Sequence, residues 1–159
     1  MEQSDSYTLR MKVQMRITKT YFSFALPYSY ERYLNMVRDL PESNEEMQVS
    51  KEVLCYSNNL NLVYVITITS KSKFLDAEER VCENSNGIIL PEKHLHPPRK
   101  YCDKPVILIS SRVHPGETTS SWAVEGIIKF IVGNSDDAKA LRKHFQIVIV
   151  PMLNPDGVE

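Results

Sequence analysis

The sequence predicts an α/β fold with a mixed, partly parallel sheet. Val106–Ser110 and residues 145–150 are almost wholly apolar, and a helical stretch separates them. Strand, helix and strand in this order, with both strands apolar, are typical of a parallel sheet covered on both faces. Earlier in the chain, Val49–Tyr56 and Leu60–Thr69 are two strand-like runs joined by a short turn, which is the pattern of a hairpin.

The first residues predict strands of a different sheet. Apolar and polar side chains alternate from Tyr7 to Ile17, and this period of two describes a half-buried strand with one wet face. A second short strand, Tyr21–Leu26, stops at Pro27. Two strands alone do not form a stable unit in water. We therefore expect the chain to open inside a sheet rather than at the start of one.

A helix is predicted next, with Ser29 as its N-cap and Pro41 ending the run. Between them, apolar side chains recur at helical spacing, at Tyr30, Tyr33, Leu34, Val37 and Leu40. In the following hairpin, Asn58 and Asn59 suit a tight turn because asparagine tolerates positive φ. Residues 71–104 are charged, interrupted by prolines and without a period, so we expect a long surface loop there.

Two helical stretches connect the two apolar strands. The second of them spans Asp136–His144, and the first runs from about Thr118 to Val132. The first is predicted to bury Trp122, Val124, Ile127, Ile128 and Ile131. With the strands on either side, these helices complete the α/β part of the chain.

Composition and charge argue against several classes of protein. Of the 159 residues, 42% are hydrophobic and 25% are charged, which is the usual balance of one globular domain. The formal net charge is −1 and the basic residues are scattered, so we expect neither a nucleic-acid partner nor a membrane. Cys55, Cys82 and Cys102 lack the paired spacing of a zinc site, and their odd number argues against a disulfide framework. A reducing, cytoplasmic location is the default expectation.

The bend after Val106–Ser110 carries the candidate site. His114 lies at the carboxyl end of this strand and Glu117 begins the next helix, which is where ligands collect in open α/β sheets. Gly116 permits a sharp turn and Pro115 restricts it, so that both side chains can face one point. An imidazole and an ionised carboxylate suit zinc, and a helix N-terminus favours the ionised state. The spacing alone leaves a second interpretation open, in which His114 ends a strand and Glu117 caps a helix.

The other histidines do not complete a zinc site, which needs a third protein ligand to be catalytic. His144 precedes its strand and so lies at the opposite end of the parallel pair, about 16 Å away at roughly 3.3 Å per residue. His94 and His96 fall in the long loop, where solvated side chains are the simpler interpretation. Asn154 and Asp156 are interpreted as part of a tight turn without a direct catalytic role.

Four separated segments together carry a family resemblance. They are Tyr21–Tyr30 (YFSFALPYSY), Glu52–Ser57 (EVLCYS) with Val65–Ser70 (VITITS), Ser110–Thr118 (SSRVHPGET) and Val150–Val158 (VPMLNPDGV). In this order they closely resemble the cytosolic carboxypeptidases, the deglutamylating branch of the carboxypeptidase-A-like zinc peptidases. The details around Cys55 and before His114 are most similar to the type-five member. The combination of HPGE and PMLNPDGV makes the resemblance specific.

The resemblance implies a fold of two incomplete parts. Residues 27–159 would be the first half of a carboxypeptidase-A-like α/β/α peptidase domain, and residues 1–26 the last strands of an antiparallel β-sandwich. His114 and Glu117 match the first two ligands of the one zinc ion that a complete domain holds. The third ligand, the substrate-binding residues and the catalytic general base have no counterpart before Glu159, so none of them is expected in this chain.

The activity implied by the resemblance is removal of glutamates from polyglutamylated or glutamate-ending proteins such as tubulin, in the cytoplasm or on microtubules. Because two ligands do not hold a working zinc, we expect the chain to be inactive by itself. Two alternatives stay open. One is an aspartoacylase-like zinc amidohydrolase, although the preceding strands and the PMLNPDG segment weigh against it. The other is a non-catalytic truncated module that binds a partner such as tubulin.

Overall fold

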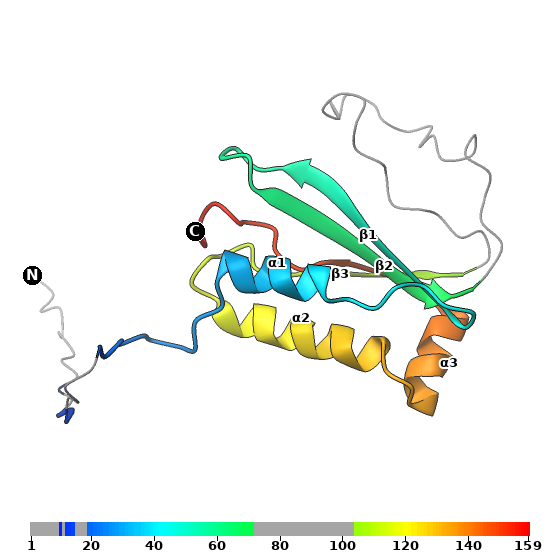
Figure 1. Cartoon of the computed structure of the whole chain (residues 1–159), viewed down its shortest axis with the longest axis horizontal. Coiled ribbons are helices and arrows are strands. Elements are labelled where there is room, and N and C mark those ends of the chain that lie inside the picture. The colour runs from blue at the N-terminus through cyan, green and yellow to red at the C-terminus, as the bar shows by residue number, and fades with distance from the viewer. Residues whose placement is uncertain (1–9, 11, 15–18, 72–103) are drawn as a thin grey trace, which may run out of the picture.

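The computed structural model describes residues 10, 12–14, 19–71 and 104–159 (Figure 1). The elements in chain order are α1 (Tyr30–Arg38), β1 (Met47–Tyr56), β2 (Leu62–Ser70), β3 (Val106–Ser110), α2 (Thr118–Ile131), α3 (Asp136–His144) and β4 (Gln146–Val150). Every helix and strand predicted from Ser29 onward is present, close to its predicted bounds. Within this described part, no helix is long and apolar enough to cross a membrane.

The four strands form one mixed sheet in the order β1-β2-β4-β3. β1 pairs antiparallel with β2, and β2 pairs antiparallel with β4. β3 and β4 run parallel, with Val106 opposite Gln146 and Ser110 opposite Val150. The predicted mixed, partly parallel sheet is therefore confirmed, including the parallel direction of the two apolar strands.

The main core lies between this sheet and the two helices α1 and α2, which lie side by side on one of its faces (Figure 1). Each helix presents an apolar stripe at helical spacing, with Tyr33 and Val37 on α1, and Val124, Ile128 and Ile131 on α2. Burying one such aliphatic side chain contributes about 1.5–3 kcal/mol. The sheet contributes buried side chains at Met47, Val49, Ile66, Ile68, Ile147 and Ile149.

Three expectations about burial were wrong. Ile127 is 37% exposed because it lies off the stripe that α2 turns toward the sheet. Val106 and Leu108 on β3 are 55% and 67% exposed, so this strand is not covered on both faces. β3 is an edge strand of the described sheet, and among the described helices α1 and α2 pack on the opposite face. Trp122 is half-buried rather than fully buried.

The strand predicted over Tyr21–Leu26 is absent. Residues 19–29 approach α1 without strand structure, and no described strand pairs with them. The apolar side chains of Tyr21, Phe22, Phe24 and Leu26 are consequently exposed. Without a partner strand among the described residues, this segment gains no ladder hydrogen bonds, and its strand-like composition alone was insufficient. The strand predicted from Tyr7 to Ile17 and almost all of the loop 71–104 lie outside the described residues, and the assignment of residues 1–26 to a β-sandwich stays a prediction.

The turn between β1 and β2 differs from its prediction in one detail. Asn58 and Asn59 form the turn, but the positive φ of 66° belongs to Leu60. The amide of Leu60 itself donates to Ser57 O at 3.0 Å, so the turn over Asn58 and Asn59 closes on the left-handed residue. A turn followed by one left-handed residue is a common three-residue hairpin connection.

Candidate metal site

His114 and Glu117 lie on the segment that connects β3 to α2, beyond the carboxyl ends of the parallel strands. The ladder extends past Ser110 by one bond, in which Ser111 N donates to Val150 O at 3.0 Å. Both candidate side chains are exposed. The predicted place in the fold is therefore observed, while metal binding by these two residues stays a prediction.

A single hydrogen-bonded turn carries both residues. Glu117 N donates to His114 O at 3.2 Å, with Pro115 and Gly116 at the two central positions. Proline suits the first central position because its φ is already set for a turn. The φ of Gly116 lies outside the left-handed region, and no atom lies within 4 Å of the place of a Cβ. The turn therefore does not use the conformational freedom of glycine, contrary to the prediction.

The Glu117 carboxylate does not cap α2. Glu117 stands at the N-cap position, but its side chain makes no capping hydrogen bond. Within the described chain, the His114 imidazole also has no hydrogen-bond or ion-pair partner. The interpretation of Glu117 as a helix cap is therefore wrong. Both side chains are free to bind a ligand from solution.

The segment from Leu153 to Gly157 packs directly against this turn. Leu153 N donates to Ser111 O at 2.9 Å, and Asn154 N donates to Arg112 O at 3.1 Å. The Asn154 side chain adds a bond from Nδ2 to Val113 O at 3.1 Å. The two sequence motifs, HPGE and NPDG, thus support each other at the same edge of the sheet. Asn154 was predicted only to form a tight turn, and in the structure it also supports the segment that carries His114.

Asp156 connects the same segment to the β1–β2 hairpin. Its Oδ1 accepts a short hydrogen bond from Ser57 Oγ and a 3.1 Å bond from Asn61 Nδ2, and its Oδ2 accepts from Asn59 N at 3.1 Å. The hydrogen bond from Ser57, the largest cause, and those from the two asparagines hold the pKa of Asp156 below its usual value. Its oxygens accept structural hydrogen bonds, so Asp156 supports the hairpin, and the absence of a direct catalytic role stays a prediction.

Arg112 is a residue of this site that the sequence did not reveal. It is 4% exposed and takes a left-handed φ of 57°. Its guanidinium donates to Pro115 O at 3.0 Å, Ser121 Oγ at 2.9 Å and Tyr28 O at 3.2 Å. A left-handed backbone is uncommon for a non-glycine residue other than asparagine, aspartate or histidine, so no residue-type signal marks it in the sequence.

The remaining candidate ligands do not join His114 and Glu117. His144 ends α3, before β4 begins, and so lies at the opposite end of the parallel pair, as predicted. His94 and His96 lie outside the described residues. Among the residues that the structure describes, no group of three His, Cys, Asp or Glu side chains is placed to hold a metal ion. An imidazole and a carboxylate are nevertheless ligands that zinc accepts, and the pair fits as two of three.

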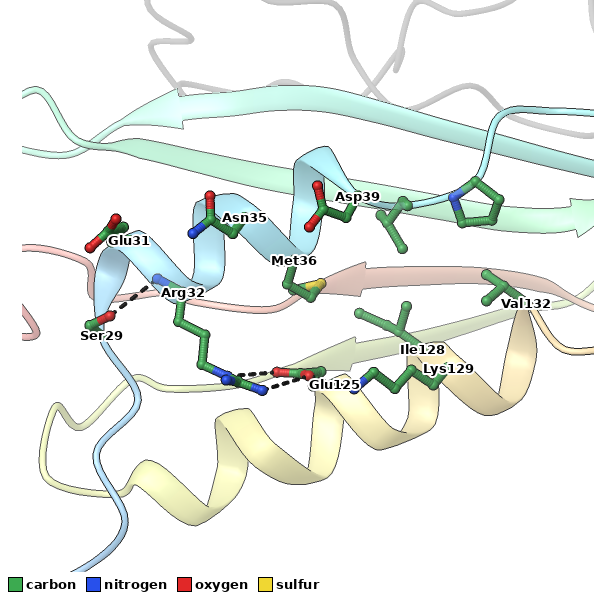
Figure 2. A pocket seen from close by; sticks show the side chains of 12 residues that line it. Ser29, Glu31, Arg32, Asn35, Met36, Asp39, Glu125, Ile128, Lys129 and Val132 are labelled. Carbon is green, nitrogen blue, oxygen red and sulfur yellow. Dashed lines mark hydrogen bonds and ion pairs between the residues drawn. The ribbon is translucent and has the colours of Figure 1, made fainter.

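A groove of about 550 Å³ lies between α1 and α2, lined by residues other than those of the metal turn (Figure 2). Across it, Arg32 Nε and Nη2 donate to the two Glu125 oxygens at 3.1 and 3.0 Å. Lys129 Nζ donates to Glu125 Oε1 at 2.7 Å. The Arg32 guanidinium also stacks 4.0 Å from the centroid of the Trp122 ring. These groups bind one another, and we assign them to helix packing.

The electrostatics of Glu125 follow from this arrangement. Burial by itself raises the pKa of Glu125, but hydrogen bonds from Lys129 and Arg32 outweigh burial and hold this pKa below its usual value. Glu125 is therefore ionised at neutral pH and locks α1 to α2. By positioning α1, this pair also helps to place Tyr28, whose carbonyl accepts from Arg112.

Comparison with known proteins gives a consistent result. A family model described as zinc carboxypeptidase matches residues 33–159. Cytosolic carboxypeptidase 3 of Bos taurus is 35% identical over 141 residues, which are 87% of this chain and 12% of the relative. Cytosolic carboxypeptidase-like protein 5 of Danio rerio is 33% identical over 160 residues, covering 92% of this chain and 18% of the relative.

A solved structure agrees with these sequence matches. The metallo-carboxypeptidase from Burkholderia cenocepacia is similar with a TM-score of 0.53 and 27% identity, over 83% of this chain and 28% of the other. The chain thus spans less than a third of that structure and a smaller share of the two curated relatives.

Proposed function

The chain belongs to the zinc carboxypeptidase family, and on this premise we propose that it supplies two zinc ligands, His114 and Glu117, to a metallocarboxypeptidase. The resemblance to the cytosolic carboxypeptidases is confirmed, with type-three and type-five relatives matching to a similar degree. The chain covers only 12% and 18% of the length of these relatives. We therefore propose the activity of the whole protein and do not derive it from these matches.

One observation carries the proposal most directly. His114 and Glu117 share one hydrogen-bonded turn at the carboxyl end of a parallel strand, and both side chains are exposed and unpaired within the described residues. This edge is where ligands bind in open α/β sheets.

The chemistry would be metal-assisted hydrolysis of a peptide bond. When bound, zinc would polarise the scissile carbonyl and lower the pKa of a bound water toward about 7. His114 would contribute a neutral ring nitrogen and Glu117 an ionised carboxylate. One zinc ion would serve each complete domain, and neither the third ligand nor the general base is assigned to a residue of this chain. By itself, the 159-residue chain would therefore not hydrolyse peptides.

The proposed substrates are polypeptides that end in glutamate or carry glutamate side chains, with tubulin tails as the example. The names of the relatives support only the cytosolic part of the proposal. The glutamate-ending substrates, tubulin and a microtubule-associated location are proposed from the resemblance of the sequence motifs to the deglutamylating branch. An acidic substrate requires basic groups in its binding site. The resemblance implies that these groups lie outside this chain, and the Arg112 guanidinium, which is buried, is not proposed as one of them.

The family match weighs against an aspartoacylase-like amidohydrolase. A non-catalytic module that binds tubulin stays the alternative, and one experiment separates it from the enzyme. The protein expressed from its complete coding sequence would be incubated with peptides ending in glutamate or in lysine, with and without a zinc chelator. We expect chelator-sensitive release of glutamate, abolished by His114→Ala and by Glu117→Gln and retained in the control His144→Ala. Tubulin binding without any glutamate release would support the module instead.

A further inference from the structure

Arg112 combines two features that are costly for an arginine. Its side chain is buried, and its backbone takes the left-handed conformation. Within the described residues it forms no ion pair, because its three hydrogen-bond partners are neutral oxygens. A buried charge and a strained backbone persist only where the surroundings over-determine them, and such residues cluster at functional sites.

The three hydrogen bonds of Arg112 meet at the candidate metal turn. Pro115 O lies between His114 and Glu117, so the bond from Arg112 Nε holds the turn at its centre. Nη1 reaches Ser121 in the first turns of α2, and Nη2 reaches Tyr28 before α1. The guanidinium therefore joins the turn to the two helices that flank it in the fold.

The backbone of Arg112 is held by different partners from those of its side chain. Its carbonyl accepts from Asn154 N at 3.1 Å, and the neighbouring Ser111 bonds to Val150 and Leu153. The strand end is thus fixed by β4 and the segment after it, while the side chain reaches forward into the turn. The left-handed residue stands where the chain leaves the strand, and its buried guanidinium bonds to the turn through Pro115 O.

From this geometry we propose that Arg112 is a positioning residue, which holds the His114–Glu117 turn in its metal-binding conformation before the metal arrives. The inference rests on the proposed role of His114 and Glu117 as zinc ligands. Exposed ligands on an unsupported turn would have to be ordered on binding, and that ordering would weaken the affinity. Loss of outer residues that orient metal ligands typically costs about 10–100-fold in metal affinity.

If Arg112 were purely structural, replacing it would lower stability without a specific effect on metal binding. A second buried arginine provides a matched control. Arg142 is 3% exposed and donates to the carbonyls of Ile131 and Gly133 at the far end of α2. Arg112→Lys and Arg142→Lys each keep a positive charge but lose the planar fork that bonds several oxygens. Both should lower thermal stability, and only the first should change metal binding.

The test uses the protein expressed from its complete coding sequence and stripped of metal. Zn²⁺ affinity is measured by competition with a chromophoric chelator, the visible spectrum of the Co²⁺ form reports the ligand geometry, and thermal unfolding is followed in parallel. We expect Arg112→Lys to weaken Zn²⁺ binding by about 10–100-fold and to alter the Co²⁺ spectrum. Arg142→Lys should leave both unchanged. Wild-type Zn²⁺ affinity in Arg112→Lys, or equal weakening in both variants, would overturn the inference.

Two further variants keep the result interpretable. If Arg112→Lys does not fold, Ser121→Ala replaces it, because this change removes one anchor of the guanidinium and should weaken Zn²⁺ binding in the same direction by less. An unchanged affinity in Ser121→Ala would then count against the inference. His114→Ala tests the metal site itself. Undiminished Zn²⁺ binding in His114→Ala would contradict the proposed function. Loss of Zn²⁺ binding in His114→Ala, together with wild-type affinity in Arg112→Lys, would contradict only the positioning role of Arg112.

Discussion

Gly157 lies so close to Pro115 that a Cβ on Gly157 would stand 3.0 Å from Pro115 Cγ and 2.9 Å from Asn154 Nδ2. The two residues are far apart in the sequence and belong to the two motifs that meet at the end of the β3–β4 pair. Glycine allows this close approach, because any larger side chain would require Asn154 or Pro115 to shift. The candidate metal turn therefore depends on a neighbour that lacks a side chain.

Replacing Gly157 by alanine should disturb the metal turn. The added methyl group has no room, so Pro115 or Asn154 must move, and overpacking of this kind typically costs about 1–3 kcal/mol. Gly116→Ala is the matched control, because the space around Gly116 is open and its φ is not left-handed. Its effect should lie within about 1 kcal/mol and can be stabilising. Denaturant unfolding of both variants measures the difference, and equal losses would contradict the close packing.

Asp156 should control the order of the β1–β2 hairpin tip. Asp156→Ala removes the acceptor of Ser57, Asn59 and Asn61, so the amides of this tip should exchange faster with solvent. Asp39→Ala is the control, because this exposed aspartate pairs with its neighbour Arg38 far from the hairpin in sequence, and the change should leave the tip unchanged. Amide hydrogen exchange measures both. Unaltered exchange at Asn59 in Asp156→Ala would show that the carboxylate does not hold the hairpin.

The pH dependence of the hairpin tip follows from the lowered pKa of Asp156. Because this pKa is depressed in the folded protein, its stabilising contribution is present above the unfolded value of about 3.9. The contribution is lost as the pH falls through the lower folded value. Exchange at the tip should therefore rise on acidification in the wild type relative to Asp156→Asn, after correction for intrinsic exchange. If the corrected exchange rates of the wild type and Asp156→Asn changed with pH in the same way, the stabilising role of the ionised carboxylate would be refuted.

The Arg32–Glu125 pair should contribute measurably to stability. Glu125→Gln removes a charge whose side chain is 7% exposed, whereas Arg32 at 43% can turn partly to water, so we expect a loss of about 1–3 kcal/mol. Glu42→Gln is the control, because its pair with Lys51 has an 87% exposed carboxylate. This control change should cost less than about 1 kcal/mol.

The stabilising effect of Glu125 should also depend on pH. Since the folded pKa of Glu125 is lowered, the greater stability of the wild type over Glu125→Gln should be lost as the pH falls below about 4.3.

Zinc content gives a direct check of the two-ligand interpretation. The isolated 159-residue chain should bind zinc substoichiometrically after dialysis, because two protein ligands are one fewer than catalytic zinc sites have. His114→Ala should remove the residual zinc, while His144→Ala should not. A full equivalent of zinc that depends on His114 would reveal a third ligand within the chain, and metal analysis after dialysis decides between these outcomes.

The elements from Ser29 onward could be predicted because their signals are local. Ser29 caps α1 through a hydrogen bond three residues away, and the apolar spacing of α2 and β4 reflects the period of each element. The parallel pair followed from two apolar strands separated by a helical stretch. Placing His114 and Glu117 at its carboxyl end then needed only the order of strand, turn and helix. The sequence by itself thus determined the fold class and the place of the candidate site.

Tertiary structure alone decided the contacts that hold this site. The order β1-β2-β4-β3, the packing of Gly157 on Pro115 and the left-handed Arg112 each depend on partners distant in the sequence. The same reason explains the misplaced expectations. Tyr21–Leu26 has a strand-like pattern, but none of the described strands lies beside it, and β3 is apolar although Val106 and Leu108 on one of its faces are exposed. Local periodicity reports which side chains favour burial, whereas burial itself is decided by the neighbours that the fold supplies.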